Sequence, residues 1–303
     1  MKANELVKKA LEIGTLIPAF NIPHIPMVEP IVEAIKDNNS VAMIQVARVE
    51  WLNFQSKSLE DVAKEYHKYK KPGYTFLHLD HIPVIDESNQ HVDYMTYIKS
   101  ACDVGYESVM IDGSRLNLEG NIAVTREVAD YVHSFDIACE AELGAVMGHE
   151  NEPISLSYEE IFEKRIGFTD VDEAEKFAAE SHCDWLSVAV GSIHGAVAES
   201  LRDQKKPEGK IDLEYLQKLF EVTQIPLVLH GGSGIPKSYI QKAVKTGIAK
   251  MNIATELRQA YEFSLRDDNN LSKAQDRVYE VCSKIIKEDL EIADNYDLLI
   301  KVN

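Results

Sequence analysis

Three histidines come at or directly after the ends of short apolar segments of this sequence. They are His81, His194 and His230. Imidazole nitrogens are preferred ligands of Zn2+, and three of them with a fourth position left open form a catalytic zinc site. A single histidine in such a place is more often a structural residue. The prediction of a metal site therefore depends on all three histidines occupying equivalent positions in the fold.

Carboxylates accompany these histidines. Asp80 directly precedes His81, and a carboxylate beside a metal-bound imidazole suits general acid–base catalysis. Asp112 and Glu142 lie near the ends of two further apolar segments. Because burying so many polar groups in unrelated places would cost free energy, one shared site is the simpler interpretation.

A glycine-rich sequence, HGGSG, begins at His230. Its three glycines allow backbone N–H groups to approach an anion closely, and a helix that opens near Pro236 would add the partial positive charge of its N-terminus. Glycine-rich turns also occur for steric reasons alone. Together with Asn252 and Thr255, however, the motif resembles the phosphate site that barrels form after their seventh and eighth strands.

The elements that would position these residues follow a regular pattern. Eight short apolar segments, rich in β-branched residues, alternate with helix-length amphipathic segments. The apolar segments span 16–22, 41–47, 74–80, 107–113, 136–144, 184–191, 225–231 and 248–253. Buried parallel strands have this composition, and eight strand–helix units predict an α/β fold of the (β/α)8 TIM-barrel type. The alternative, an open doubly wound sheet, would require a glycine-rich turn after the first strand, which the sequence lacks.

We expect a single domain over residues 1–303, with the barrel core at about 14–255. An amphipathic segment at the N-terminus predicts an extra helix before the barrel. Residues 256–303 predict a C-terminal helical extension that serves packing or oligomer contacts. The long connection at 145–168 is expected to be a functional loop or lid, and the alternative is a tolerated surface insertion.

Composition excludes several classes of function. The chain of 303 residues has 32 Lys and Arg against 50 Asp and Glu, a net charge of -18. Nucleic acids and anionic membranes would be repelled by this charge, so neither is expected as a partner. The 4 cysteines are far apart, as in proteins of a reducing compartment. Without a secretory signal or an apolar span, we expect a cytoplasmic location.

Seven motifs in order resemble one known family. They are AFN (19–21), HLDH (78–81), IDGS (111–114), EAELG (140–144), VGSIHG (190–195), LVLHGGSG (227–234) and KMNIATEL (250–257). Over about residues 5–265 the chain resembles the class II, zinc-dependent fructose-bisphosphate and tagatose-bisphosphate aldolases. The resemblance implies a lyase of carbohydrate metabolism and glycolysis that forms a homo-oligomer, either a dimer or a tetramer.

The resemblance assigns roles residue by residue. It implies one Zn2+ per subunit held by His81, His194 and His230, with Asp112 and Glu142 close to the metal or at an alternative metal position. It implies that Asp80 exchanges a proton with the C4 hydroxyl at the bond being broken, and that Glu150 on a mobile loop exchanges the C3 proton. The residues implied to bind substrate, phosphate and a nearby Na+ or K+ are Asn21, Gly195, Gly231, Ser233, Asn252, Ala254 and Thr255.

The chemistry agrees with these roles. Aldol cleavage needs a base for a hydroxyl proton and an electron sink, and Zn2+ is a Lewis acid that stabilises an enediolate. A Schiff-base lysine is then not required. A second carboxylate on a closing loop would exclude water.

The sequence departs from the family where the second substrate would bind. Arg48 follows the second apolar segment, where relatives often have a serine; it is either a binding group for an anion or a surface arginine. Ala254 stands where fructose-specific members often have Asp and tagatose-type members have Ala. The sequence also shows no clear match to the C-terminal segment that carries a phosphate-binding arginine across the dimer.

The function expected first is therefore metal-dependent cleavage of fructose 1,6-bisphosphate into dihydroxyacetone phosphate and glyceraldehyde 3-phosphate. Tagatose 1,6-bisphosphate or another acidic sugar phosphate is the alternative substrate. A metal-dependent isomerase or epimerase would use Glu150 and Asp80 without breaking a bond. A subunit that has kept the fold but lost activity is a third interpretation, which the intact histidines and acids argue against.

Overall fold

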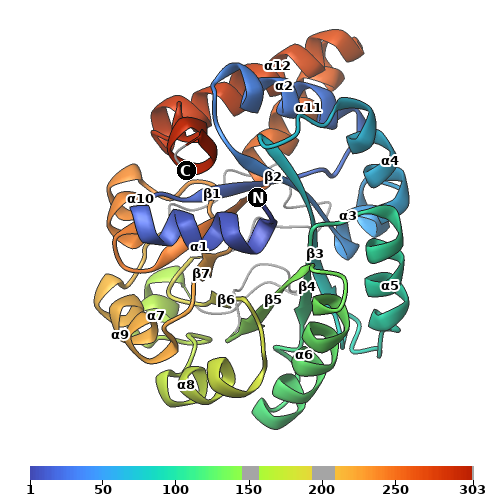
Figure 1. The fold of residues 1–303 in the computed structure, drawn as a ribbon. Helices are drawn as coiled ribbons and strands as arrows, with labels where there is room; N and C mark the ends of the chain where they lie inside the picture. Colours follow the sequence, from blue (N-terminus) through green and yellow to red (C-terminus); the bar gives the residue numbers. More distant parts are fainter. Residues whose placement is uncertain (145–156, 193–208, 302–303) are drawn as a thin grey trace.

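Eight parallel strands close into a barrel in sequence order (Figure 1). The computed structural model describes residues 1–144, 157–192 and 209–301. The strands are β1 (Ile17–Asn21), β2 (Ala42–Ala47), β3 (Thr75–Pro83), β4 (Ser108–Asp112), β5 (Ala138–Leu143), β6 (Trp185–Val188), β7 (Leu227–Leu229) and β8 (Ile248–Ile253). Each predicted segment contains a strand, so the predicted (β/α)8 barrel is confirmed. Only β3 runs past its predicted end, because it continues through an irregularity in its pairing with β4.

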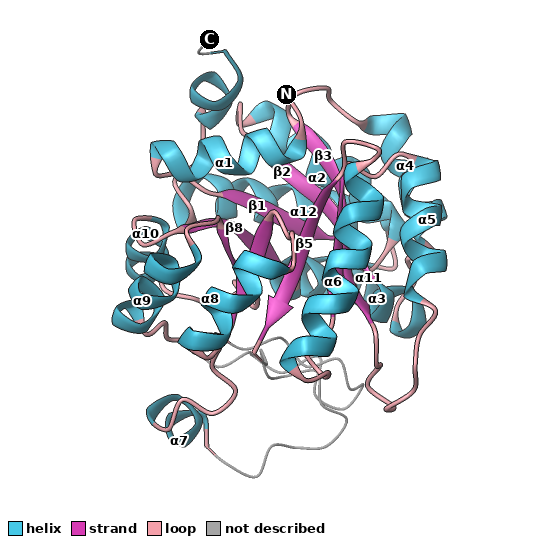
Figure 2. Cartoon of the chain, turned by 60° about the horizontal axis from the view of Figure 1, so that its bottom comes forward, coloured by secondary structure: helices cyan, strands magenta, loops and turns pink. Residues whose placement is uncertain are grey.

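Helices surround the barrel (Figure 2). Those before β7 are α1 (Ala3–Ile13), α2 (Val28–Asp37), α3 (Arg48–Asn53), α4 (Leu59–Tyr69), α5 (Tyr94–Val104), α6 (Leu118–His133), α7 (Tyr158–Glu163), α8 (Val171–Glu180) and α9 (Leu213–Thr223). Those after β7 are α10 (Lys237–Val244), α11 (Thr255–Asp268) and α12 (Leu271–Lys284). In the described part of the chain, none of these helices is long and apolar enough to cross a bilayer.

The predicted N-terminal helix, α1, lies across the end of the barrel at which the strands begin (Figure 1). Its buried residues Leu6, Val7 and Ala10 belong to one apolar cluster with residues from the starts of the strands, among them Ile17 and Trp185. Each of these side chains removes apolar surface from water. The helix therefore seals the amino-terminal end of the barrel and leaves the carboxyl-terminal rim for chemistry.

The predicted C-terminal helices are also present. α11 and α12 pack against each other, and α12 lies along α2 (Figure 1). Two short π-helical segments follow, η2 (Ile285–Asp289) and η3 (Asp297–Lys301). The extension thereby covers the outside of the barrel near its first strands.

Candidate active site

His81 is placed by an irregularity at the end of β3. The register between β3 and β4 shifts between Leu79 and Ile82, and His81 has a φ of 26°, a backbone conformation that side chains of L residues rarely adopt. Such irregularities redirect a side chain at the rim of a barrel, and strained residues are concentrated at functional sites. The local strain thus turns the His81 ring toward the neighbouring strand ends.

Three of the predicted site residues meet at the rim. The ring centroids of His81 and His230 are 4.5 Å apart. One ligand atom each from Asp80, His81 and His230 lies within 4.8 Å of the others. His194, the third predicted imidazole, and Glu150 and Gly195 lie outside the described residues.

Carboxylates hold one nitrogen of each imidazole. His81 Nδ1 lies 3.2 Å from Asp112 Oδ2, and His230 Nε2 lies 2.9 Å from Glu140 Oε1. The other nitrogens both face Glu142: its Oε2 is 3.1 Å from His230 Nδ1 and 4.0 Å from His81 Nε2. Metal-bound histidines commonly have this arrangement, in which a carboxylate orients the ring through the nitrogen that does not bind metal. The residues present therefore fit a divalent cation beside Glu142.

The electrostatic field of this site also favours a cation. Burial would lower the pKa of His81, but Asp80, Asp112 and Glu142 outweigh it and raise that pKa to about 10. Burial opposes the charged form of His230 as well, yet hydrogen bonds to Glu140 and Glu142 raise its pKa. Carboxylates that stabilise a proton on a buried imidazole also stabilise a metal ion that displaces the proton.

A buried lysine lies deeper in the barrel. Lys250 and Glu140 are both completely buried, and Lys250 Nζ lies 2.9 Å from Glu140 Oε2 and 2.6 Å from Asn252 Oδ1. Sequence reasoning missed this pair, although a lysine inside the apolar segment 248–253 is itself a signal. The lysine compensates the charge of Glu140, the carboxylate that orients His230. This role in charge compensation is consistent with a reaction that does not use a Schiff-base lysine.

Replacing Lys250 with methionine should lower the free energy of unfolding by about 3–5 kcal/mol, because it removes the ammonium group that pairs with the buried charge of Glu140. Adding Glu140→Gln should recover part of the loss. Urea unfolding of the metal-free proteins measures both effects. Lys273→Met, at an exposed ion pair, is the control and should change stability little. If both substitutions changed the free energy of unfolding equally, Lys250 would not be compensating a charged, buried Glu140.

Asp80 is held by three side-chain amides. Asn21 Nδ2 and Gln45 Nε2 donate to its Oδ2 at 2.9 and 3.1 Å, and Asn252 Nδ2 donates to its Oδ1 at 3.0 Å. Burial would raise the pKa of Asp80, but the cationic His81, His230 and Lys250 more than offset this and lower it. Asp80 is thus an oriented, ionised carboxylate, which is the state a general base requires.

Glu50 is a second buried carboxyl at this rim and was not predicted from the sequence. Its Oε2 accepts hydrogen bonds from Ala47 N at 2.8 Å and from Asn21 Nδ2 at 3.3 Å. Burial is the largest cause that raises the pKa of Glu50 to about 8, and the charge of Asp80 adds to it. The only sequence signal was a glutamate three residues after the second strand ends.

The stability of the wild-type protein should fall relative to Glu50→Gln as the pH rises from about 4.5 to about 8. In this range the unfolded chain has lost the Glu50 proton while the folded protein still holds it. Each pH unit then costs up to about 1.4 kcal/mol, whereas glutamine does not titrate. Urea unfolding of both metal-free proteins at about pH 5 and about pH 8 measures the difference. Equal changes in the two proteins would contradict a protonated Glu50.

The glycine-rich loop after β7 approaches β8 closely. A Cβ on Gly232 would lie 2.5 Å from Met251 Cγ and 2.8 Å from the Asn252 carbonyl oxygen, so only glycine fits. Gly231 has a φ of 65°, which also favours glycine. The Gly234 N–H donates to Glu256 Oε1 at 3.1 Å. Sterics and this hydrogen bond thus fix the loop.

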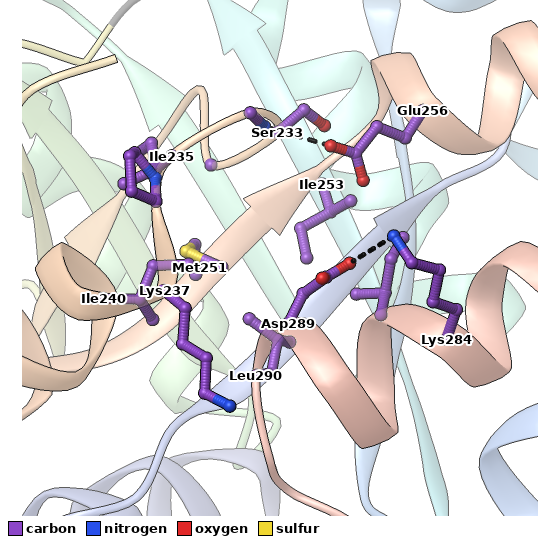
Figure 3. A pocket seen from close by; sticks show the side chains of 14 residues that line it. Ser233, Ile235, Lys237, Ile240, Met251, Ile253, Glu256, Lys284, Asp289 and Leu290 are labelled. Carbon is purple, nitrogen blue, oxygen red and sulfur yellow. Dashed lines mark hydrogen bonds and ion pairs between the residues drawn. The ribbon is translucent and has the colours of Figure 1, made fainter. Parts of the chain in front are cut away.

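A cavity of about 700 Å³ lies behind this loop (Figure 3). Its wall includes Met251 and Ile253, which alternate along β8 with the interior residues Lys250 and Asn252. Because side chains alternate between the faces of a strand, this cavity lies outside the barrel and is separate from the site around Asp80.

The remaining predicted residues lie at the same rim or beside it. Asn252 contacts Asp80, while Ala254 and Thr255 lie where β8 ends and α11 begins. Ser233 is buried in the glycine-rich loop. The side chain of Arg48 is 16% exposed, and its Nη1 lies 3.5 Å from Asp86 Oδ2. Arg48 is therefore not a freely exposed surface arginine, and its role in substrate binding stays a prediction.

The fold and these residues define a barrel enzyme whose strand ends combine metal-suited imidazoles with an oriented carboxylate. Comparison with known families identifies the class of reaction. The profile of the family fructose-bisphosphate aldolase class-II matches residues 1–296, so the chain belongs to this family. The protein is accordingly an aldolase, and the expectation of a lyase is confirmed.

Solved structures that resemble this chain include proteins described as aldolases. The YdjI aldolase from Escherichia coli K12 has 25% sequence identity and a TM-score of 0.73, over 96% of this chain and 98% of that one. A protein assigned as a fructose-1,6-biphosphate aldolase from Coccidioides immitis has 25% identity and a TM-score of 0.76, over 98% of each chain. The fructose-bisphosphate aldolase of Campylobacter jejuni shares the fold at 20% identity, with a TM-score of 0.72 over 96% of this chain and 94% of that one.

Proposed function

We propose that the protein catalyses the reversible aldol cleavage of a ketose bisphosphate, with fructose 1,6-bisphosphate as the first candidate. The products would be dihydroxyacetone phosphate and glyceraldehyde 3-phosphate. The observation that carries the proposal is the convergence of Asp80, His81 and His230 within 4.8 Å in a chain of the aldolase family.

The ion proposed for this site is Zn2+, held by His81, His230 and His194, with Glu142 and Asp112 beside it. When bound, it supplies a Lewis acid that draws electron density from the bond being broken. Imidazole ligands with carboxylate partners suit zinc, whereas magnesium and calcium prefer oxygen ligands.

Asp80 would take the proton from the C4 hydroxyl during cleavage and return it during condensation. Its two oxygens are already fixed by Asn21, Gln45 and Asn252, so little reorientation is needed before the proton moves. Glu150 is proposed as the partner that exchanges the C3 proton.

The phosphate of the dihydroxyacetone half would bind at the loop after β7 and at the start of α11. Backbone N–H groups and the helix N-terminus attract an anion without a lysine cluster, which suits an acidic protein. The residues proposed for this site and for an adjacent Na+ or K+ are Gly195, Gly231, Ser233, Ala254 and Thr255. We also propose a homo-oligomer and a cytoplasmic location.

Tagatose 1,6-bisphosphate is the second candidate substrate, and Ala254 favours it. The residue lies directly before α11, at the end of β8. In place of an aspartate, alanine offers no carboxylate to a hydroxyl of the substrate. The two sugars differ in the orientation of one hydroxyl, so a missing hydrogen bond at the rim would change the preference between them.

A panel assay tests the proposal. Purified protein is given fructose 1,6-bisphosphate, tagatose 1,6-bisphosphate and carboxylate analogues, with and without chelator, and triose phosphate is measured. We expect triose phosphate from at least one ketose, loss with chelator and recovery with added Zn2+. Interconversion of ketoses without triose formation would support the isomerase or epimerase alternative instead. Turnover that is unaffected by chelator would contradict the proposed metal dependence.

A further inference from the structure

Glu50 is the third residue of α3 and lies on the same rim as Asp80. The strand that precedes it, β2, ends at Ala47, and Ala47 pairs with Asp80 of β3. The side chain of Glu50 folds back over the start of its own helix. Only 5% of the residue is exposed.

One amide group joins the two carboxyl groups. Asn21 Nδ2 lies 2.9 Å from Asp80 Oδ2 and 3.3 Å from Glu50 Oε2. An amide nitrogen carries two hydrogens, so it can donate one to each carboxyl group. Glu50 is therefore a direct neighbour of the group proposed to move the substrate proton.

The two oxygens of Glu50 have different surroundings. Oε2 accepts both hydrogen bonds, from Ala47 N and Asn21 Nδ2. Oε1 makes no hydrogen bond to the described residues, and it is not among their fully buried unpartnered side-chain atoms. One oxygen thus anchors the side chain, and the other is left for a further hydrogen bond.

Helix capping does not explain this burial. Glu5 of α1 and Glu160 of α7 occupy the same position in their helices, and each also accepts a hydrogen bond from the residue before its helix. Both are exposed, as capping carboxylates usually are, whereas Glu50 is buried. Burying an acid beside Asp80 costs free energy. Because capping does not require this burial, we expect Glu50 to have a further function.

We propose that Glu50 Oε1 hydrogen-bonds to the hydroxyl of a 2-hydroxyaldehyde, the aldehyde half of the substrate, and so determines specificity. The inference rests on the proposed function. The phosphate would bind beside β7 and β8, and Asp80 on β3 would serve C4. The adjoining part of the substrate, which carries the hydroxyl at C5, then extends toward β2 and Glu50.

Glu50 would act as a neutral hydrogen-bond donor. Burial is the main cause of its raised pKa of about 8, so the acid keeps its proton at neutral pH. A protonated carboxyl has one O–H to give, and Oε2 is already occupied as an acceptor, so the proton belongs on Oε1. A neutral donor also avoids placing a second negative charge beside Asp80.

The test uses the condensation reaction of the metal-loaded enzyme with dihydroxyacetone phosphate. Two aldehydes are compared: glyceraldehyde and 3-hydroxypropanal, which lacks the 2-hydroxyl group. The quantity measured is the ratio of kcat/KM for the two aldehydes. Differences in their intrinsic reactivity cancel when this ratio is compared between variants.

Glu50→Ala should reduce the preference for glyceraldehyde about tenfold to a hundredfold, the loss expected for one buried hydrogen bond to substrate. Glu50→Gln keeps an N–H donor in the same place and should retain the preference within about threefold. Glu5→Ala removes a capping carboxylate far from the rim and should leave the ratio unchanged. Thermal unfolding of each variant checks that it folds.

The outcomes separate the two proposals. If the wild-type enzyme condenses both aldehydes and Glu50→Ala leaves the ratio unchanged, the inference is overturned while the aldolase assignment stands. An equal loss in Glu50→Ala and Glu50→Gln would overturn the assignment of Glu50 as a donor. If the wild-type enzyme condenses neither aldehyde and cleaves no ketose phosphate, the proposed function fails, and the inference fails with it.

Discussion

Replacing Asp80 with alanine should lower kcat for carbon–carbon cleavage by about 10²–10⁴-fold while the metal stays bound. The carboxylate is buried, ionised and fixed by three amides, so it is built to accept a proton rather than to support the fold. Triose release gives the rate, and elemental analysis of the dialysed protein gives the zinc content. Asp103→Ala, at an exposed position on α5, is the control and should behave as wild type.

The zinc content decides how Asp80 acts. Full zinc occupancy with a large loss of rate is the expected result. If Asp80→Ala loses its zinc, Asp80 is a ligand or a structural support, because its carboxylate lies within reach of the same point as His81 and His230. A rate within a few-fold of wild type would exclude Asp80 as the group that moves the C4 proton.

His230→Ala should lose both metal and activity. His230 is completely buried, and its Nδ1 faces the point beside Glu142 where the cation is proposed. Changing a residue that merely orients a ligand already weakens metal binding about 10–100-fold, so removing a ligand should weaken it more. Competition with a chelator of known affinity measures the zinc dissociation constant.

A matched control separates loss of a ligand from loss of a histidine. His91 is exposed and lies before α5, so His91→Ala should bind zinc and cleave substrate as the wild type does. If His230→Ala kept full zinc occupancy and an unchanged rate, the proposal that His230 is a zinc ligand would be wrong.

The fold could be predicted from the sequence because the same pattern, an apolar strand followed by an amphipathic helix, occurs eight times. Each of the eight strands is buried on both faces, and a segment such as 41–47 then has almost no polar residues. The rule that chemistry lies at the carboxyl ends of strands predicted Asp80, His81 and His230 at one rim, and the structure brings these three together.

The contacts among these residues could not be predicted in the same way. The turn of the His81 ring depends on a register shift of β3, which leaves no mark in the composition. The amide of Gln45 comes from β2, the strand next to β3, whereas the amide of Asn252 reaches Asp80 only because barrel closure brings β8 to the same carboxylate. Lys250 was not predicted as a site residue because segment 248–253 was interpreted as uniformly apolar. A lysine in a buried strand requires a charged partner, which here is Glu140.

Anomalous diffraction at the zinc edge, from crystals of the zinc-loaded protein, is the decisive test of the proposed metal centre. We predict one zinc peak per subunit at about 2.0–2.1 Å from His81 Nε2, His230 Nδ1 and a ring nitrogen of His194. A zinc ion bound elsewhere, or one coordinated without these imidazoles, would contradict the proposed centre and the cleavage chemistry assigned to it.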